Sequence, residues 1–251
     1  MNRINVWIAG LAAGAVAIGW ATAADITVSA AASLTNAFQE IGKQYEREHP
    51  SDRVLFNFGS SGQLLQQIAR GAPVDVFASA DQESMDKAEK EGAIDRSSRF
   101  DFVRNQLVLV VPADSRLSMR ELREVSQSGV KKIAIGNPDS VPAGRYAKAA
   151  LEKAGLWSAL QDRFINTVNV RQALDYVARG EVDAGFVYAS DALLMPVRVK
   201  AVLPVDVPQP ILYPVAVVRG GGNQKGGAAF VAYLKSATAA EILGRFGFQK
   251  P

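Results

Sequence analysis

The sequence contains no cysteine and a single histidine, His49. The lack of cysteine excludes disulfide bridges, thiol catalysis, cysteine-ligated metals and a lipid on an N-terminal cysteine. A lone histidine beside Pro50, where a helix is predicted to end, gives no support to a Ser-His-Asp triad or a histidine-ligated metal. No carboxylates are paired in a way that indicates acid–base catalysis. We therefore predict that the protein is not an enzyme and needs no cofactor.

The sequence also has little net charge, no internal repeat and no low-complexity tract. Its formal charge is +3, with basic and acidic residues interspersed, so neither a nucleic-acid nor a membrane partner is indicated. The glycine-rich segment 220–227 is not a phosphate-binding loop, because Gly226 follows Lys225 where Ser or Thr is needed. Ser128 and Lys131 match a Ser-x-x-Lys pattern without its companion motifs.

The only long apolar stretch lies at the N-terminus. Arg3 precedes an uncharged run from Val6 to Trp20, and Ala21-Thr22-Ala23 follows as a small-x-small cleavage site. The run is shorter than the ~20 residues that a membrane-spanning helix needs. We predict a secretory signal peptide over residues 1–24, cleaved after Ala23 or Ala24, in preference to a membrane anchor. The mature chain is then expected in the periplasm.

From Ile26 onward, short apolar strands alternate with amphipathic helices. This order predicts an α/β fold made of open sheets with helices on both faces. The alternation of strands and helices begins again after the apolar strand 107–111, and we expect a helix near 119–125. The chain thus contains two α/β units of similar size, which are joined near 104–111 and again near 212–218. This arrangement predicts two lobes with a hinge and a ligand in the cleft between them.

The candidate binding residues lie where strands lead into helices. Ligands of open α/β sheets bind beyond the carboxyl ends of the strands, where helix N-termini offer unpaired N–H groups and partial positive charge. Four junctions are rich in small or polar residues: Ala30–Thr35, Gly59–Gln63, Pro138–Gly144 and Asn169–Arg171. Taken singly, each also fits an ordinary helix cap or loop. Arg171 fits either an anion clamp or an interlobe arginine, and Tyr188 either a cleft or a core residue.

Seven segments span nearly the whole mature chain: Ala30–Phe38, Ile68–Asp81, Val141–Lys148, Val170–Leu174, Val187–Asp191, Tyr213–Val218 and Ala239–Phe248. In this order they resemble the periplasmic molybdate-binding protein of ABC-type molybdate importers. The resemblance implies a type II periplasmic binding protein with one lobe at about 25–103 plus 213–251 and the other at 104–212.

The same resemblance implies five binding residues. Ser33 and Ser61 would donate through hydroxyl and backbone groups, Ala143 and Val170 through backbone N–H groups, and Tyr188 through its phenol. The implied function is capture of molybdate, and of tungstate, for delivery to a membrane permease by a monomeric receptor.

Neutral donors suit such an anion. Molybdate near neutral pH only accepts hydrogen bonds, and donors worth ~1.5–3 kcal/mol each can offset the cost of burying its charge. The alternatives are a receptor for sulfate or phosphate, an enzyme on the same scaffold, and a sensor domain that delivers its ligand to a signalling protein.

Overall fold

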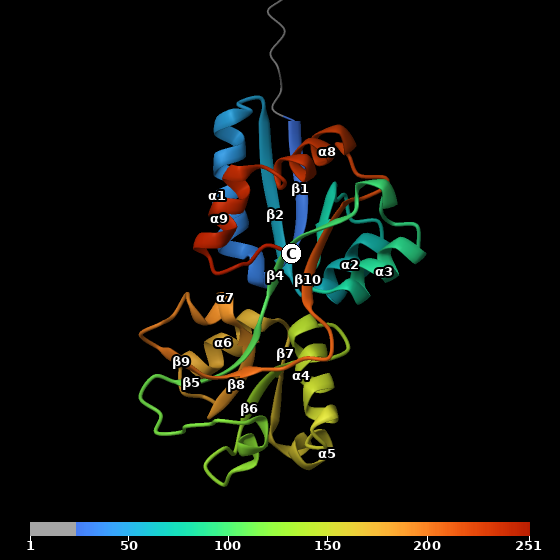
Figure 1. The fold of residues 1–251 in the computed structure, drawn as a ribbon. Coiled ribbons are helices and arrows are strands. Elements are labelled where there is room, and N and C mark those ends of the chain that lie inside the picture. Colours follow the sequence, from blue (N-terminus) through green and yellow to red (C-terminus); the bar gives the residue numbers. More distant parts are fainter. Residues whose placement is uncertain (1–23) are drawn as a thin grey trace, which may run out of the picture.

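The computed structural model describes residues 24–251, which form two lobes, each built on a five-stranded sheet (Figure 1). The first sheet has the strand order β2-β1-β3-β10-β4. Strands β1, β2 and β3 are parallel, and β10 pairs antiparallel with both β3 and β4. The bounds are β1 (Ala24–Ala31), β2 (Asp52–Gly59), β3 (Val76–Ala78), β4 (Phe100–Asn105) and β10 (Ile211–Val217).

Five helices belong to this first lobe. They are α1 (Thr35–Glu48), α2 (Ser61–Ala69), α3 (Gln82–Lys90), α8 (Gln224–Tyr233) and α9 (Ala237–Arg245). Helix α1 buries Phe38, whose ring packs 5.7–6.2 Å from the rings of Phe56, Phe102 and Phe230. The C-terminal helices α8 and α9 therefore complete the core that the N-terminal strands begin.

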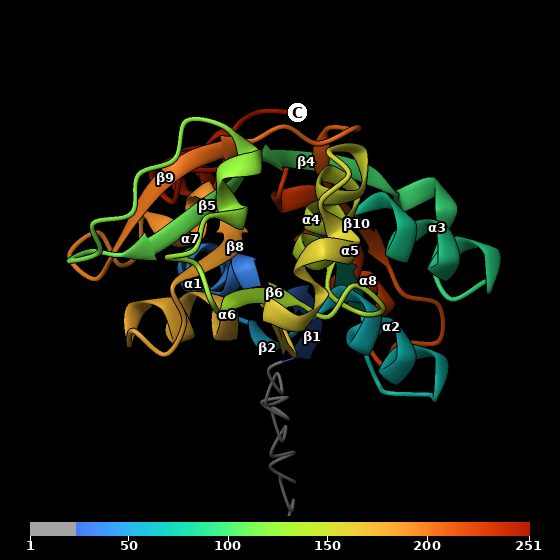
Figure 2. The same cartoon turned by 90° about the horizontal axis from the view of Figure 1, so that it is seen from below.

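The second sheet has the order β7-β6-β8-β5-β9. Strands β7, β6 and β8 are parallel, whereas β5 runs antiparallel to β8 and β9. The strands are β5 (Leu107–Pro112), β6 (Ile133–Gly136), β7 (Phe164–Thr167), β8 (Ala184–Tyr188) and β9 (Val199–Val205). The helices are α4 (Pro142–Lys153), α5 (Trp157–Leu160), α6 (Val170–Ala178) and α7 (Ala189–Ala192), and Figure 2 shows α4 and α6 on opposite sides of β6. Because helices cover both faces of this sheet, every residue of β6 and β8 is buried. The two strands consist of apolar residues and glycine, with Tyr188 as the last residue of β8.

Two segments connect the lobes. Gln106 alone separates β4 of the first sheet from β5 of the second, and residues 206–210 separate β9 from β10. Residues from 104–107 and from 205–211 line the same hollow, so the two connections lie close together. Two adjacent crossings suit a hinge between the lobes.

The predicted α/β class with two lobes is confirmed, while one predicted helix is wrong and two strands were missed. The helix expected near 119–125 is only a 3₁₀ turn, Leu122–Ser126. Strands β4 and β9 were not anticipated. Strand β9 contains Pro204, a residue that disfavours strands, but β9 is an edge strand, where proline is tolerated.

The predicted signal peptide lies outside the described residues, apart from Ala24 at the start of β1. Among residues 24–251, no helix combines the length and the apolar character that crossing a membrane requires.

Candidate functional site

Several strand-to-helix junctions of both lobes meet at one small cavity. Its lining includes all five predicted binding residues, Ser33, Ser61, Ala143, Val170 and Tyr188. The remaining lining residues are small, apolar or neutral: Ala31, Ala32, Gly59, Ser60, Ala80, Val141, Pro142 and Asn169. The centre of a water-sized sphere can move through only about 10 Å³ of the cavity, so the space holds a group of only a few atoms. The cavity therefore suits a small ion better than an organic solute.

The first lobe contributes hydroxyl groups. Ser61 Oγ accepts a hydrogen bond from the backbone N–H of Ala80 at 3.0 Å, so its own proton is free to donate into the cavity. Ser33 Oγ lies 3.0 Å from Tyr213 Oη, which also accepts from Asn105 Nδ2 at 3.3 Å. Because Asn105 donates to that phenol, the Tyr213 proton can point at Ser33 and leave the serine proton free.

The second lobe contributes peptide N–H groups at helix starts. Val170 is the first residue of α6, and the Asn169 side chain caps Gln172 N at 3.0 Å instead. Pro142 is the first residue of α4 and has no N–H, so Ala143 carries the first peptide donor of that helix. The first N–H groups of a helix have no partner within it, and these two have no other partner among residues 24–251. Each helix start also carries a partial positive charge that favours an anion.

Tyr188 adds a phenol from the end of β8. Its side chain is buried, and Oη has no hydrogen-bond partner in the described part of the chain. Burial raises the pKa of Tyr188 well above its usual value of 10.0, with smaller contributions from Tyr213, Tyr146 and two aspartates. The phenol therefore stays protonated and can donate to an anion at any ordinary pH.

Arg171 crosses between the lobes beside the cavity. From α6 it reaches the Asn36 side chain at 2.8 Å and the Ser33 carbonyl at 3.0 Å, both in the first lobe. Its Nε lies 2.6 Å from Asp191 Oδ1 without hydrogen-bond alignment, so this contact is an ion pair. Burial raises the pKa of Asp191, and Arg171 opposes the shift. Arg171 is thus an interlobe residue with a compensated charge and does not line the cavity.

Arg145 makes a second crossing, which the sequence analysis did not identify. From α4 it approaches Asp81 at 2.7 Å and Ser84 Oγ at 2.9 Å, both in the first lobe. No residue that lines the cavity carries a charge. Among residues 24–251, no group of three or more His, Cys, Asp or Glu is placed to hold a metal ion. The cavity can therefore bind an anion only through neutral donors and helix starts.

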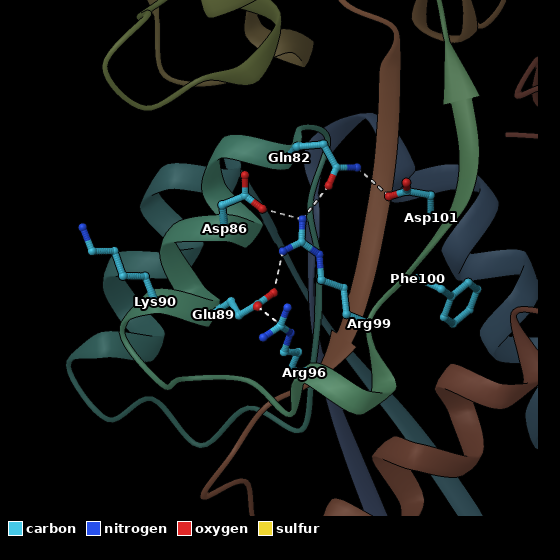
Figure 3. Close-up of a pocket in the computed structure, with 8 residues that line it drawn as sticks. All are labelled: Gln82, Asp86, Glu89, Lys90, Arg96, Arg99, Phe100 and Asp101. Carbon is cyan, nitrogen blue, oxygen red and sulfur yellow. Dashed lines mark hydrogen bonds and ion pairs between the residues drawn. The ribbon is translucent and has the colours of Figure 1, made fainter.

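A larger hollow, of about 740 Å³ by the same measure, lies on the first lobe and is highly charged (Figure 3). Arg99 there is bonded to Asp86 at 2.6 Å, Glu89 at 2.7 Å and Gln82 at 2.6 Å. Arg96 is paired with Glu89 at 3.0 Å. Both arginines already have carboxylate partners, so this open hollow is a poor anion site.

Ser60 also lines the cavity, although the resemblance implied only its neighbour Ser61. The Gly-Ser-Ser-Gly motif offered two hydroxyls, and nothing in the motif distinguishes the one that is bonded within the protein from the one that is not.

Comparison with known proteins agrees with this geometry. The family model described as bacterial extracellular solute-binding protein matches residues 26–249. The molybdate-binding protein ModA of Escherichia coli (strain K12) is 43% identical, the match covering 89% of this chain and 88% of that protein. A putative ABC transporter substrate-binding lipoprotein, YvgL, of Bacillus subtilis (strain 168) is 38% identical over 89% of this chain and 85% of its own.

Among solved structures, the periplasmic molybdate-binding protein of Azotobacter vinelandii superposes with a TM-score of 0.78 at 26% identity, covering 90% of this chain and 99% of that one. These relatives are binding proteins, which confirms the prediction that the chain is not an enzyme. The chain belongs to the family of bacterial extracellular solute-binding proteins, together with the molybdate-binding proteins that it matches.

Proposed function

We propose that the protein binds molybdate in the interlobe cavity through Ser33, Ser61, Ala143, Val170 and Tyr188. The observation that carries this proposal is a small, uncharged cavity whose hydroxyl and N–H donors come from both lobes. The similarity to molybdate-binding proteins supports the choice of ion.

The donor set explains which anions fit. A dianion that only accepts hydrogen bonds can use every donor, and each bond to a charged group contributes about 1.5–3 kcal/mol. A protonated phosphate needs an acceptor for its O–H, and no carboxylate lines the cavity. Sulfate has the charge and shape of molybdate, so only size can separate them. Tungstate is close to molybdate in size and charge and is proposed as a second ligand.

The family supports a role in transport. We propose that a signal peptide is removed from residues 1–24, that the mature chain acts in the periplasm as a monomer, and that it delivers the anion to the membrane permease of an ABC importer. Molybdate is then a transported ligand, with no cofactor involved. The moving bodies are proposed as residues 25–103 plus 213–251 and residues 104–212, closing about the paired connections.

A thermal screen tests the ligand assignment. The purified protein is heated with molybdate, tungstate, sulfate, phosphate or amino acids. A ligand at 1,000 times its dissociation constant should stabilise the fold by about 4 kcal/mol. Molybdate should raise the melting temperature most, together with tungstate. A larger shift with sulfate or phosphate, or none with any oxyanion, would refute the assignment.

Calorimetric titration tests the residues. Ser33→Ala, Ser61→Ala and Tyr188→Phe should each weaken molybdate binding about tenfold or more, as expected for the loss of a hydrogen bond to a charged group. Ser51→Ala is the matched control, because Ser51 is exposed and its hydroxyl bonds only to Asp52. Affinities equal to that of the control would remove these residues from the site.

A further inference from the structure

Ser60 occupies an unusual position among the helix caps of this protein. It is the residue before α2, where a serine hydroxyl normally accepts a hydrogen bond from an N–H of the first turn. No such bond forms here. The N–H of Gly62, in that first turn, instead donates across the lobes to the Ser140 carbonyl at 3.0 Å.

Other caps in the described chain behave as expected. Asp81, Asn169, Asn223 and Ser236 each accept a bond from the helix they precede. Ser236 is the same residue type as Ser60 and accepts from Ala239 N at 3.1 Å. The free hydroxyl of Ser60 therefore reflects its surroundings and not its residue type.

The Ser60 hydroxyl is also buried without a partner. The residue is 2% exposed, lines the cavity, and its Oγ has no hydrogen-bond partner in the described residues. Leaving a buried hydroxyl unsatisfied costs about 1–3 kcal/mol. Tyr188, a proposed ligand donor, lines the same cavity, and its Oη is likewise buried without a hydrogen-bond partner in the described residues. A ligand acceptor placed in the cavity satisfies both groups at once.

We propose that Ser60 donates its hydroxyl to the bound anion as a donor additional to the five named above. This inference rests on the proposed anion-binding function. The first lobe then binds the anion with three serine hydroxyls, from Ser33, Ser60 and Ser61. Of these, Ser60 alone has no hydrogen bond within the described protein, so its donor capacity is available only to the ligand.

The test uses Ser60→Ala and Ser236→Ala, with unfolding measured without ligand and molybdate affinity measured by calorimetry. Ser60→Ala should leave the free protein as stable as wild type or more stable, because it removes an unsatisfied buried group, and should weaken molybdate binding about tenfold. Ser236→Ala should do the opposite: it destabilises the free protein through loss of a cap and leaves the affinity unchanged.

The outcomes separate this proposal from the function on which it rests. If wild type binds sulfate and not molybdate, the assigned ligand fails, and the Ser60 test is repeated with sulfate. A Ser60→Ala protein that is less stable than wild type and binds the anion with unchanged affinity would show that Ser60 is a structural cap. Unchanged affinity in a stabilised Ser60→Ala protein also overturns the proposal, as does a wild-type protein that binds no anion.

A second inference rests on the two interlobe arginines. The structure assigns Arg145 and Arg171 a positioning role in the closed state. Each lies within two residues of a proposed N–H donor, Ala143 on α4 and Val170 on α6. Each reaches across to the first lobe, Arg171 to Ser33 and Asn36, and Arg145 to Asp81 and Ser84. Opening the hinge breaks these contacts, so they stabilise the closed form and slow ligand release.

The lobe-one partners offer a clean test of this role. Asn36→Ala removes a cross-lobe hydrogen bond and leaves the Arg171–Asp191 pair intact, and Ser84→Ala does the same for Arg145 while leaving its Asp81 pair intact. Arg99→Ala is the control, because its partners Gln82, Asp86 and Glu89 all lie in the first lobe (Figure 3).

Stopped-flow measurements of molybdate association and dissociation then give the readout. Asn36→Ala and Ser84→Ala should each speed dissociation several-fold and change association by less than about twofold, since interface changes act mainly on the off-rate. Arg99→Ala should lower stability without changing either rate. Equal dissociation rates in wild type, Asn36→Ala and Ser84→Ala would overturn the positioning role.

Discussion

The two lobes present hydrogen-bond donors in different ways. The first lobe offers the hydroxyls of Ser33, Ser60 and Ser61, whereas the second offers the peptide N–H groups of Ala143 and Val170 together with the Tyr188 phenol. A hydroxyl depends on residue type and is lost on change to alanine. A peptide N–H depends on where a helix begins. Apart from Tyr188, side-chain identity in the second lobe therefore acts mainly through packing, and the predictions below test that difference.

The largest expected effect is on the packing that sets the start of α4. A Cβ at Gly144 would lie 1.8 Å from the carbonyl oxygen of Gly136 in β6. Backbone cannot yield that far without separating helix from strand, so Gly144→Ala should lower the unfolding free energy by about 3 kcal/mol or more. Denaturant unfolding measures this. Gly244→Ala is the control: it has open space and should stabilise α9 by ~0.5–1 kcal/mol. Equal stabilities would contradict the close approach.

Removing a single peptide donor should have the next largest effect. Proline is well tolerated as the first residue of a helix and lacks an N–H, so Val170→Pro deletes the donor at the start of α6. Asn169, at φ −161° and ψ 172°, already has the extended backbone that a following proline favours. Molybdate affinity should fall about 10- to 100-fold. Val170→Ala keeps the N–H and should lower stability with affinity within a few-fold of wild type. A folded proline variant that binds like wild type would exclude this donor.

The third prediction contrasts two hydroxyls that differ in their bonding within the protein. Tyr188 Oη has no partner in the described residues, whereas Ser61 Oγ accepts from Ala80 N. Tyr188→Phe should weaken binding about tenfold while the free protein keeps or gains stability. Ser61→Ala should lower both affinity and stability, the latter by ~1 kcal/mol, because it leaves a buried N–H unpaired. Calorimetry measures the affinity and denaturant unfolding measures the stability of both variants. Equal changes in stability for Tyr188→Phe and Ser61→Ala would contradict the predicted contrast.

A smaller effect is expected where the lobes touch. A Cβ at Gly62 would lie 2.8 Å from the carbonyl oxygen of Ser140 and 2.9 Å from its Cα. Because these residues belong to different lobes, Gly62→Ala should hinder closure without disturbing either core. Molybdate affinity should fall several-fold, and the melting temperature of the free protein should not decrease. Loss of stability in the free protein would place the clash inside a lobe.

The smallest expected effect is that of alkaline pH on binding. Burial raises the pKa of Tyr188 well above 10.0, so the phenol remains a donor, and molybdate affinity should change less than about twofold between pH 7 and 9.5. A folded pKa above the unfolded value means that stability is present below pH 10 and is lost as pH rises further, because the unfolded chain releases its proton first. Titration calorimetry between pH 7 and 9.5 measures the molybdate affinity, and a decline in affinity centred below pH 9 would contradict the prediction.

Much of the fold was predictable because its signals are local. Strand and helix periodicity and the apolar runs in β6 and β8 predicted an α/β fold with the correct class. The failures came where neighbours decide the outcome. Pro204 disfavours a strand in isolation, yet at the edge of a sheet it leaves no essential hydrogen bond unmade. Segment 119–125 has helical spacing but forms only a 3₁₀ turn.

The sequence by itself indicated the junctions where donors lie, because a helix start preceded by a strand, with small or hydroxyl residues between them, occupies consecutive positions. The resemblance to molybdate-binding proteins then selected Ser33, Ser61, Ala143, Val170 and Tyr188, and all five line one cavity. Only the tertiary structure decided which hydroxyls are already bonded. Ser60 and Ser61 are neighbours, but the N–H of Ala80, nineteen positions from Ser61, donates to the Ser61 hydroxyl. The Ser60 hydroxyl has no partner in the described residues. Likewise, Arg145 meets Asp81 across sixty-four positions. The first pairing depends on how two strand–helix junctions pack within one lobe, and the second depends on how the two lobes meet, so no local pattern encodes either contact.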